Sequence, residues 1–202
     1  HPRNVLQKEA YSLRLLTTLA EKEEILYGLG VDKVEVLRFT KDFSVMTTEE
    51  YLRFIMKEYG VTAVLLGYDN RIGCDAKDSD QVARIAENLG LDVIRTDMVS
   101  SERGFAVSST KIREMLEAGD VENAAAMLGR NYSLHGVVVM GNRLGRTIGF
   151  PTANVQLYEP LKLVPGNGVY FVKVNTVGRD LYGMCNVGCR PTVGLGNART
   201  IE

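Results

Sequence analysis

The sequence lacks the features that would place the protein on nucleic acid, in a membrane or outside the cell. Its 24 basic and 25 acidic residues give a formal net charge of −1, so charge gives no reason to expect binding to nucleic acid or to an anionic membrane. No apolar run approaches the roughly 20 residues that cross a bilayer, and no signal-peptide pattern is present.

Cysteine is also scarce. The chain has three cysteines, an odd number that argues against a disulfide framework. Cys185 and Cys189 have no second pair beside them, and the chain has only two histidines, so the spacing excludes a typical zinc site. We therefore predict a reducing, cytoplasmic location. The 202 residues, 45% of them hydrophobic, are enough for one large or two small domains with real cores.

Residues 1 to about 128 alternate helix-like and strand-like patterns, which predicts a parallel sheet with crossover helices. The expected helices cover residues 8–29, 47–59, 81–89, 111–117 and 121–128. The expected strands cover residues 33–39, 61–66 and 91–96. The almost wholly apolar run 61–66 is typical of a strand covered on both faces.

After Gly129 the pattern changes to short β-branched or aromatic runs separated by glycine-rich turns. The expected strands cover residues 132–140, 168–175 and 181–187, with a hairpin turn within 174–180. We therefore predict a small antiparallel barrel or sandwich. The boundary falls between an α/β domain at 1–130 and a β domain at 131–202.

The run Gly141-Asn-Arg-Leu-Gly-Arg-Thr-Ile-Gly-Phe-Pro-Thr-Ala-Asn154 carries the clearest chemical signal. Its glycines would let the backbone approach a bulky anion, two arginines add positive charge, and Thr152 and Asn154 offer oxygen ligands on one face of an extended segment. This set suits a metal-bound polyphosphate. The run is neither a Walker A loop nor G-x-G-x-x-G, and spacing alone is more typical of a mobile surface loop.

Two motifs in the first half could bind anions. Ser108-Ser-Thr-Lys-Ile-Arg113 opens a predicted helix, so its hydroxyls either cap the helix or join its N–H groups and cations in a phosphate site. Gly67-Tyr-Asp-Asn-Arg-Ile-Gly73 follows an apolar strand, where ligands of open α/β sheets bind. On its own it could equally be a turn with an exposed Asp–Arg pair.

Taken in order, these motifs resemble the bifunctional bacterial riboflavin kinase/FAD synthetase family over nearly the whole chain. The first half contributes Gly67-Tyr-Asp69 to Gly73, Val107-Ser-Ser-Thr110 and Leu128-Gly-Arg130. The second half contributes Gly149-Phe-Pro-Thr-Ala-Asn154, Asn186-Val-Gly188, Arg190-Pro-Thr192 and Thr200-Ile-Glu202.

The resemblance implies a Rossmann-like nucleotidyltransferase domain followed by a kinase barrel. The kinase would transfer the γ-phosphoryl group of ATP to riboflavin, and the adenylyltransferase would join FMN to the α-phosphate of a second ATP. The substrates would be riboflavin, FMN and ATP, with Mg²⁺ as cofactor. By the same resemblance, Thr152 and Asn154 hold Mg²⁺ and ATP, and Glu202 accepts the proton of the flavin hydroxyl. The other kinase-site residues are Gly141, Arg143, Gly145, Arg146, Gly149, Pro151, Asn186 and Arg190.

The resemblance assigns the adenylyltransferase site to the two motifs of the first half. Its residues are Gly67, Asp69, Arg71, Gly73, Ser108, Ser109, Thr110 and Arg113. The family carries aromatic residues where this chain has Asn70 and Ile72, which puts flavin stacking there in doubt. The histidine motif with which the family's first module begins is not in this sequence, and the family continues beyond Glu202. We therefore expect a middle part of a longer protein, in which a chain-terminal Glu202 would be poorly held.

Two other functions fit the same residues less well. The first is a riboflavin kinase with a degenerate adenylyltransferase domain, which Asn70 and Ile72 would favour. The second is a non-catalytic flavin-binding protein, for which Thr152, Asn154 and Glu202 would be unnecessary.

Overall fold

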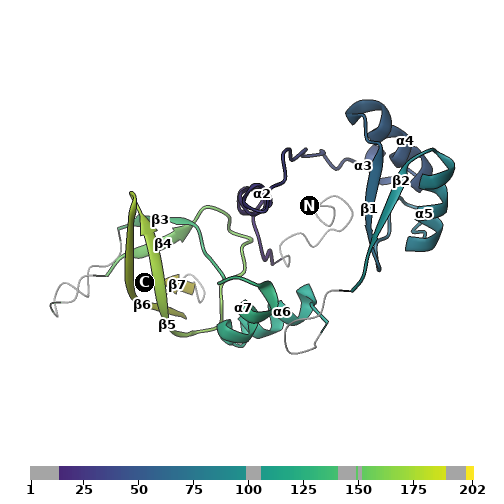
Figure 1. Ribbon diagram of the computed structural model, residues 1–202. Helices are drawn as coiled ribbons and strands as arrows, with labels where there is room; N and C mark the ends of the chain where they lie inside the picture. Colours follow the sequence, from purple (N-terminus) through teal and green to yellow (C-terminus); the bar gives the residue numbers. More distant parts are fainter. Residues whose placement is uncertain (1–13, 99–105, 141–148, 150–151, 190–198) are drawn as a thin grey trace. The chain divides into compact units, whose positions relative to one another are not determined.

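The computed structural model describes residues 14–98, 106–140, 149, 152–189 and 199–202. The chain forms two compact units, and the described part of the first comes from Asp32–Ala106. The second comprises Arg14–Val31 and Val107–Glu202. Figure 1 shows the elements of both units along the chain.

The first unit has a parallel α/β core. Its elements are α3 (Lys41–Ser44), α4 (Thr48–Tyr59), β1 (Ala63–Gly67), α5 (Ser79–Asn88) and β2 (Asp92–Thr96). Strands β1 and β2 pair in parallel, which confirms the predicted parallel sheet. Helices α4 and α5 supply Leu52, Val82 and Ala86 to clusters that pack on Val64 and Val93. The opposite face carries the exposed pair Leu65 and Ile94, so within the described chain only one face of this sheet is covered, in contrast to our prediction.

The second unit joins helices to antiparallel strands. Its helices are α2 (Leu19–Gly28), α6 (Ser109–Glu117) and α7 (Val121–Leu128). Its strands are β3 (Gly136–Val139), β4 (Asn154–Leu157), β5 (Gly168–Thr176), β6 (Arg179–Cys189) and β7 (Arg199–Ile201). All strand pairs in this unit are antiparallel, in the orders β3-β4 and β5-β6-β7. The predicted hairpin turn is confirmed, with Val177 and Gly178 between β5 and β6.

The core of this unit crosses the boundary that we predicted at residue 130. Leu163, from the segment between β4 and β5, is buried in one cluster with Ile112, Leu116, Ala124 and Met127. Helices α6 and α7 therefore belong to the same compact unit as the β-strands. The division into catalytic modules at 130 and 131 stays a prediction.

A buried ion pair fixes α2 to the strand-bearing part of this unit. The Lys162 ammonium lies 2.5 Å from Glu21 Oε2, and both side chains are almost fully buried. Lys162 Nζ also donates to the Leu16 carbonyl and lies 4.5 Å from the centre of the Tyr132 ring. Burial lowers the pKa of Lys162, and its hydrogen bond to Glu21 opposes that shift.

Two predicted elements differ from the structure for identifiable reasons. The described part of the expected helix 8–29 becomes helical only at Leu19, because Thr18 forms a capping box with Glu21. Leu15 instead pairs with Lys162 as an isolated bridge. Residues 33–39 are not a strand, since no described segment pairs with them and a strand needs a partner for its backbone groups.

Candidate active sites

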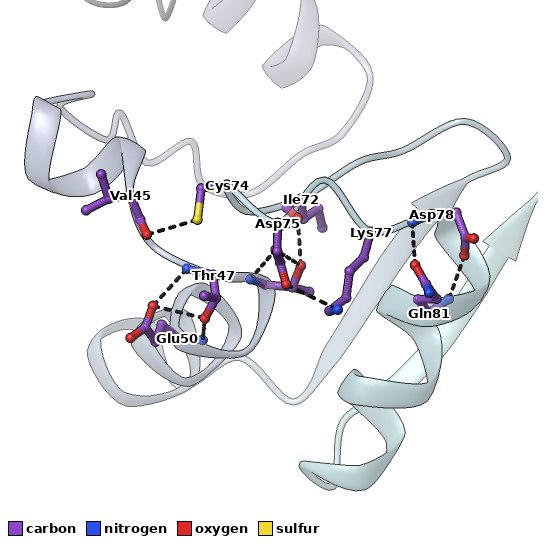
Figure 2. Close-up of polar contacts among 10 residues, drawn as sticks. Val45, Thr47, Glu50, Ile72, Cys74, Asp75, Lys77, Asp78 and Gln81 are labelled. Atoms are coloured by element: carbon purple, nitrogen blue, oxygen red, sulfur yellow. Dashed lines mark hydrogen bonds and ion pairs between the residues drawn. The ribbon is translucent and has the colours of Figure 1, made fainter.

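The loop after β1 carries three predicted site residues, Asp69, Arg71 and Gly73, and is anchored on helix α4 (Figure 2). Asp75 Oδ1 accepts the Thr48 backbone N–H at 2.9 Å and lies 2.7 Å from the Thr48 hydroxyl. That hydroxyl lies equally close to the Ile72 carbonyl, to which it can donate instead. These hydrogen bonds hold the pKa of Asp75 below its usual range. The loop is thus held at the start of α4 by a helix-capping contact.

Gly73 has its place in this loop for steric reasons. Its φ is +80°, and a Cβ there would lie 2.3 Å from the Thr48 nitrogen. Only glycine fits this approach without displacing the backbone. Asp69 and Arg71 are exposed, whereas Ile72 packs on the cluster around Leu66 and Val82. Ile72 therefore serves the core of the first unit.

A cleft of about 400 Å³ lies beside this loop, at the carboxyl ends of β1 and β2. The start of α5, where Asp78 accepts the Gln81 N–H, borders it, so a helix start and the strand ends share one concave surface. Arg95 pairs with Asp80 across 2.5 Å at its edge. Sequence reasoning missed most of this lining, although its residues end a strand, follow one or open a helix. The lining residues are Leu66, Tyr68, Asp78, Ser79, Asp80, Arg95, Thr96 and Asp97.

The Ser108–Arg113 motif opens α6 in the second unit, as predicted. Ser108 is the N-cap residue, but its side chain makes no capping hydrogen bond. The interpretation of Ser108 as a plain cap is therefore wrong. Ser109 and Thr110 are exposed in the first turn, where backbone N–H groups and the helix dipole favour an anion.

Arg113 is fixed beside this turn. Its guanidinium donates to the Arg14 carbonyl at 2.9 Å and to the Ser109 carbonyl at 3.0 Å. These bonds keep a permanent positive charge at the start of α6. The 67–73 loop belongs to the other compact unit, so the structure describes the two halves of the predicted adenylyltransferase site separately.

Asn186 and Glu202, both predicted for the kinase site, lie directly opposite each other. The Asn186 N–H donates to the Glu202 carbonyl at 2.7 Å, and the Glu202 N–H returns a bond of 3.0 Å. Opposed residues of an antiparallel pair project to the same face. One carboxylate oxygen of Glu202 is buried. Our expectation that Glu202 would be poorly held is wrong, because it extends the β6–β7 pairing by one residue.

Strand β7 is secured from its other end by Arg199. The Arg199 guanidinium donates to the carbonyls of Val164 and Pro165, in the buried segment that also carries Lys162. This contact lies three residues before Glu202. It fixes the strand from which the predicted base projects.

The predicted metal ligands lie at the start of β4, which contacts β7. Asn154 is the first residue of β4, opposite Val139, and Thr152 is exposed two residues earlier. Gly149 is described and exposed. The remaining predicted kinase residues, Gly141, Arg143, Gly145, Arg146, Pro151 and Arg190, lie outside the described residues.

Comparison with known proteins assigns the two halves to enzyme families. Residues 1–111 match the FAD synthetase family and residues 128–202 match the riboflavin kinase family. A parallel α/β region followed by antiparallel β structure thus accompanies matches to two nucleotide-dependent transferase families. The chain belongs to the bifunctional riboflavin kinase/FMN adenylyltransferase family.

Curated relatives and a solved structure match almost the whole chain. The bifunctional riboflavin kinase/FMN adenylyltransferase of Listeria monocytogenes is 33% identical over 100% of this chain, and that of Pseudomonas fluorescens is 36% identical over 95%. The chain spans 64% and 61% of their lengths. A crystal structure described as that of a macrolide-efflux protein from Streptococcus pneumoniae superposes with a TM-score of 0.88. It is 30% identical, and the match covers 100% of this chain and 64% of that one. Within the described part of this chain, no helix has the length and hydropathy to cross a membrane.

Proposed function

We propose that the protein containing this chain makes flavin cofactors in the cytoplasm in two ATP-dependent steps. The first phosphorylates riboflavin to FMN, and the second adenylylates FMN to FAD. The observation that carries the proposal is the pairing of Asn186 on β6 with Glu202 at the end of β7, the strand that contacts β4, which begins at Asn154. Residues that the family resemblance assigns to one kinase site thus come from adjoining strands. The finer fold proposal is a Rossmann-like nucleotidyltransferase domain and a closed kinase barrel.

In the proposed kinase step, Glu202 is the general base. It accepts the proton of the riboflavin 5′-hydroxyl, whose oxygen bonds to the γ-phosphorus of ATP. The bond from that phosphorus to the β–γ bridging oxygen breaks, and ADP leaves. The two backbone bonds to Asn186 and the Arg199 contact on β7 hold the base in one position. Such positioning is what phosphoryl transfer chiefly requires from the protein.

The oxygen donors at the start of β4 fit Mg²⁺ that arrives with ATP. Thr152 and Asn154 offer two hard, neutral ligands, and Mg²⁺ commonly takes one or two protein ligands and completes its shell with phosphate oxygens and water. The bound ion would neutralise negative charge on the phosphates. No cluster of three His, Cys, Asp or Glu side chains that could hold a metal occurs among the described residues.

In the proposed adenylyl step, the start of α6 binds the ATP phosphates. The exposed hydroxyls of Ser109 and Thr110, the helix N–H groups and the fixed Arg113 would hold the triphosphate. An FMN phosphate oxygen bonds to the α-phosphorus, the bond to the α–β bridging oxygen breaks, and pyrophosphate leaves. The 67–73 loop and its cleft belong to the other compact unit, and they are proposed to contact flavin and adenine.

A pair of variants in the intact protein tests both assignments. Glu202→Gln should abolish most FMN formation from riboflavin while FAD formation from added FMN continues, because only the base is lost. Arg113→Ala should show the opposite pattern, because it removes a charge at the phosphate site of α6. Chromatography of the flavin products measures both activities, and circular dichroism checks folding. Loss of both activities in either folded variant would refute the assignment.

A further inference from the structure

Three consecutive carbonyl groups, just before β5 in the sequence, bind both outer strands of the β5-β6-β7 sheet. The Arg199 guanidinium on β7 donates to the carbonyls of Val164 and Pro165. The Tyr170 hydroxyl on β5 donates to the next carbonyl, that of Gly166, at 2.5 Å. We call the segment formed by these three carbonyl-bearing residues the carbonyl clamp. One short segment thus holds a strand at each edge of the sheet.

The carbonyl clamp is itself fixed against helix α6. The Gly166 N–H donates to the Leu116 carbonyl in the last turn of α6 at 2.7 Å. Pro165 and Gly166 are buried, and a Cβ on Gly166 would lie 2.6 Å from the Glu117 carbonyl oxygen. Because glycine has no Cβ, the two backbones can approach this closely. The clamp therefore has a fixed place in the second unit.

The two side chains that bind the clamp project to the same face of the sheet. Tyr170 lies opposite Cys185, and Arg199 lies opposite Cys189. Cys185 and Cys189 are four residues apart on β6, and residues an even number apart on a strand share a face. Opposed residues also share a face. Tyr170 and Arg199 therefore reach the clamp from one side of the sheet.

The proposed kinase residues project to the other side. Asn186 follows Cys185 on β6, and its backbone exchanges two hydrogen bonds with Glu202. Successive residues of a strand alternate between faces, so Tyr170 and Arg199 do not share the face of Glu202. Arg199 lies three residues before Glu202, about 10 Å along the strand. The clamp therefore acts on the strand that carries the proposed base, and not on the substrate side of that strand.

Strand β7 depends on such an anchor because it is short and lies at the edge of its sheet. It has three residues, and among the described strands it pairs only with β6. A short edge strand has few ladder hydrogen bonds to resist local opening. The planar guanidinium of Arg199 donates two bonds at once, which fixes its orientation as well as its distance. Burial raises the pKa of Tyr170, and the positive charge of Arg199 opposes that rise, so the two clamp-binding groups lie near each other.

We propose that Arg199 and Tyr170 are positioning residues for the proposed kinase reaction. The proposal rests on the kinase function proposed above, and it adds two groups that bind neither riboflavin nor ATP. Through the clamp they fix the strands on both sides of β6, which keeps Glu202 within reach of the riboflavin hydroxyl. A displacement of about 1 Å at the reacting atoms lowers turnover by about a hundredfold. Small shifts of β7 should therefore change kcat before they change substrate affinity.

The test compares Arg199→Met and Tyr170→Phe with matched control variants in the intact protein. The controls are Arg179→Met, at the exposed hairpin end of β6, and Tyr158→Phe, whose side chain is 72% exposed. FMN formation gives KM and kcat, flavin fluorescence gives riboflavin affinity, and calorimetry gives ATP affinity. Arg199→Met should lower kcat by about tenfold or more and Tyr170→Phe by about threefold. Both affinities, and FAD formation from added FMN, should change little. Arg199→Lys should recover part of the lost kcat, because its ammonium still donates to one carbonyl.

The outcomes separate positioning from other roles. If the unaltered protein does not phosphorylate riboflavin, the proposed kinase function fails. If it does, and Arg199→Met keeps the kcat of Arg179→Met, the positioning proposal alone is overturned. Weaker riboflavin or ATP binding with an unchanged kcat would also overturn it, because Arg199 would then bind substrate. If circular dichroism shows that Arg199→Met does not fold, Tyr170→Phe decides, since it removes a single hydroxyl. An unchanged kcat in that folded variant would overturn the proposal.

Discussion

Removal of the Lys162 charge should destabilise the second unit far more than removal of an exposed lysine. Lys162 Nζ and Glu21 Oε2 are 2.5 Å apart, and their side chains are only 2% and 3% exposed. In Lys162→Met the Glu21 carboxylate keeps the Thr18 N–H as a donor but loses its cation, while remaining buried. Breaking a buried pair from one side costs about 3–5 kcal/mol. Glu21 Oε1 has no hydrogen-bond partner within the described part of the chain, so little else would compensate the carboxylate charge. We therefore expect Lys162→Met to lower the free energy of unfolding by about 4 kcal/mol.

A second substitution should recover much of this loss. In the double variant Glu21→Gln/Lys162→Met, the amide oxygen can still accept the Thr18 N–H, and no net charge is buried. The double variant should therefore be more stable than Lys162→Met alone. The interaction energy between Glu21 and Lys162 in the double-mutant cycle should be about 2 kcal/mol or more.

The matched control is Lys173→Met. Lys173 pairs with Asp180 at 2.7 Å, but the two side chains are 55% and 50% exposed, so its loss should cost less than about 1 kcal/mol. Because the chain has two compact units, the free energy of opening is measured by hydrogen exchange of peptides from β4 and β5 with mass-spectrometric detection. Equal losses in the free energy of opening for Lys162→Met and Lys173→Met would refute the stabilising role of the buried ion pair.

Three further substitutions test separate parts of the structure. Asn154→Ala should lower FMN formation by roughly a hundredfold, as expected for loss of a positioned electrostatic group, and near-normal kinase activity in a chromatographic assay would exclude the metal–ATP role. Val177, whose φ is +44°, should be replaced favourably by Asn, with a gain of about 1 kcal/mol in urea unfolding, and a loss of stability would show that the β-branched residue is not strained there. The lowered pKa of Asp75 means that its stabilisation is present above the ordinary carboxyl range, about pH 4, and disappears as pH falls through the lowered value. Asp75→Asn should therefore weaken the acid dependence of α4 protection in hydrogen exchange, and an unchanged pH profile would contradict this role.

Local signals in the sequence predicted much of the fold. Thr47 and Glu50 form the capping box that the sequence indicates at the start of α4, and the turn at Val177–Gly178 lies where the hairpin pattern places it. These features depend on residues three or fewer positions apart. The alternation of apolar segments was likewise sufficient to predict the parallel pairing of β1 with β2.

Contacts between distant residues could not be predicted in the same way. Glu21 and Lys162 are 141 positions apart, and each alone is typical of an exposed charged residue. Strand β4 was missed as a strand because its polar–apolar alternation covers only the four residues Asn154–Leu157, and it becomes a strand by pairing with β3. The Asn186–Glu202 contact likewise depends on the register of β6 with β7. Its chemical role was suggested only by the family resemblance.

The most direct measurement follows the phosphorus atoms of ATP into the flavin products. The intact protein is incubated with riboflavin, Mg²⁺ and ATP that carries radioactive phosphorus at the γ position in one reaction and at the α position in another. The two proposed steps require γ label in both FMN and FAD, and α label in FAD only. Gamma label in FMN without any α label in FAD would support the kinase activity and contradict the adenylyltransferase activity. The absence of γ label from every flavin would contradict the proposed function of the Glu202 site.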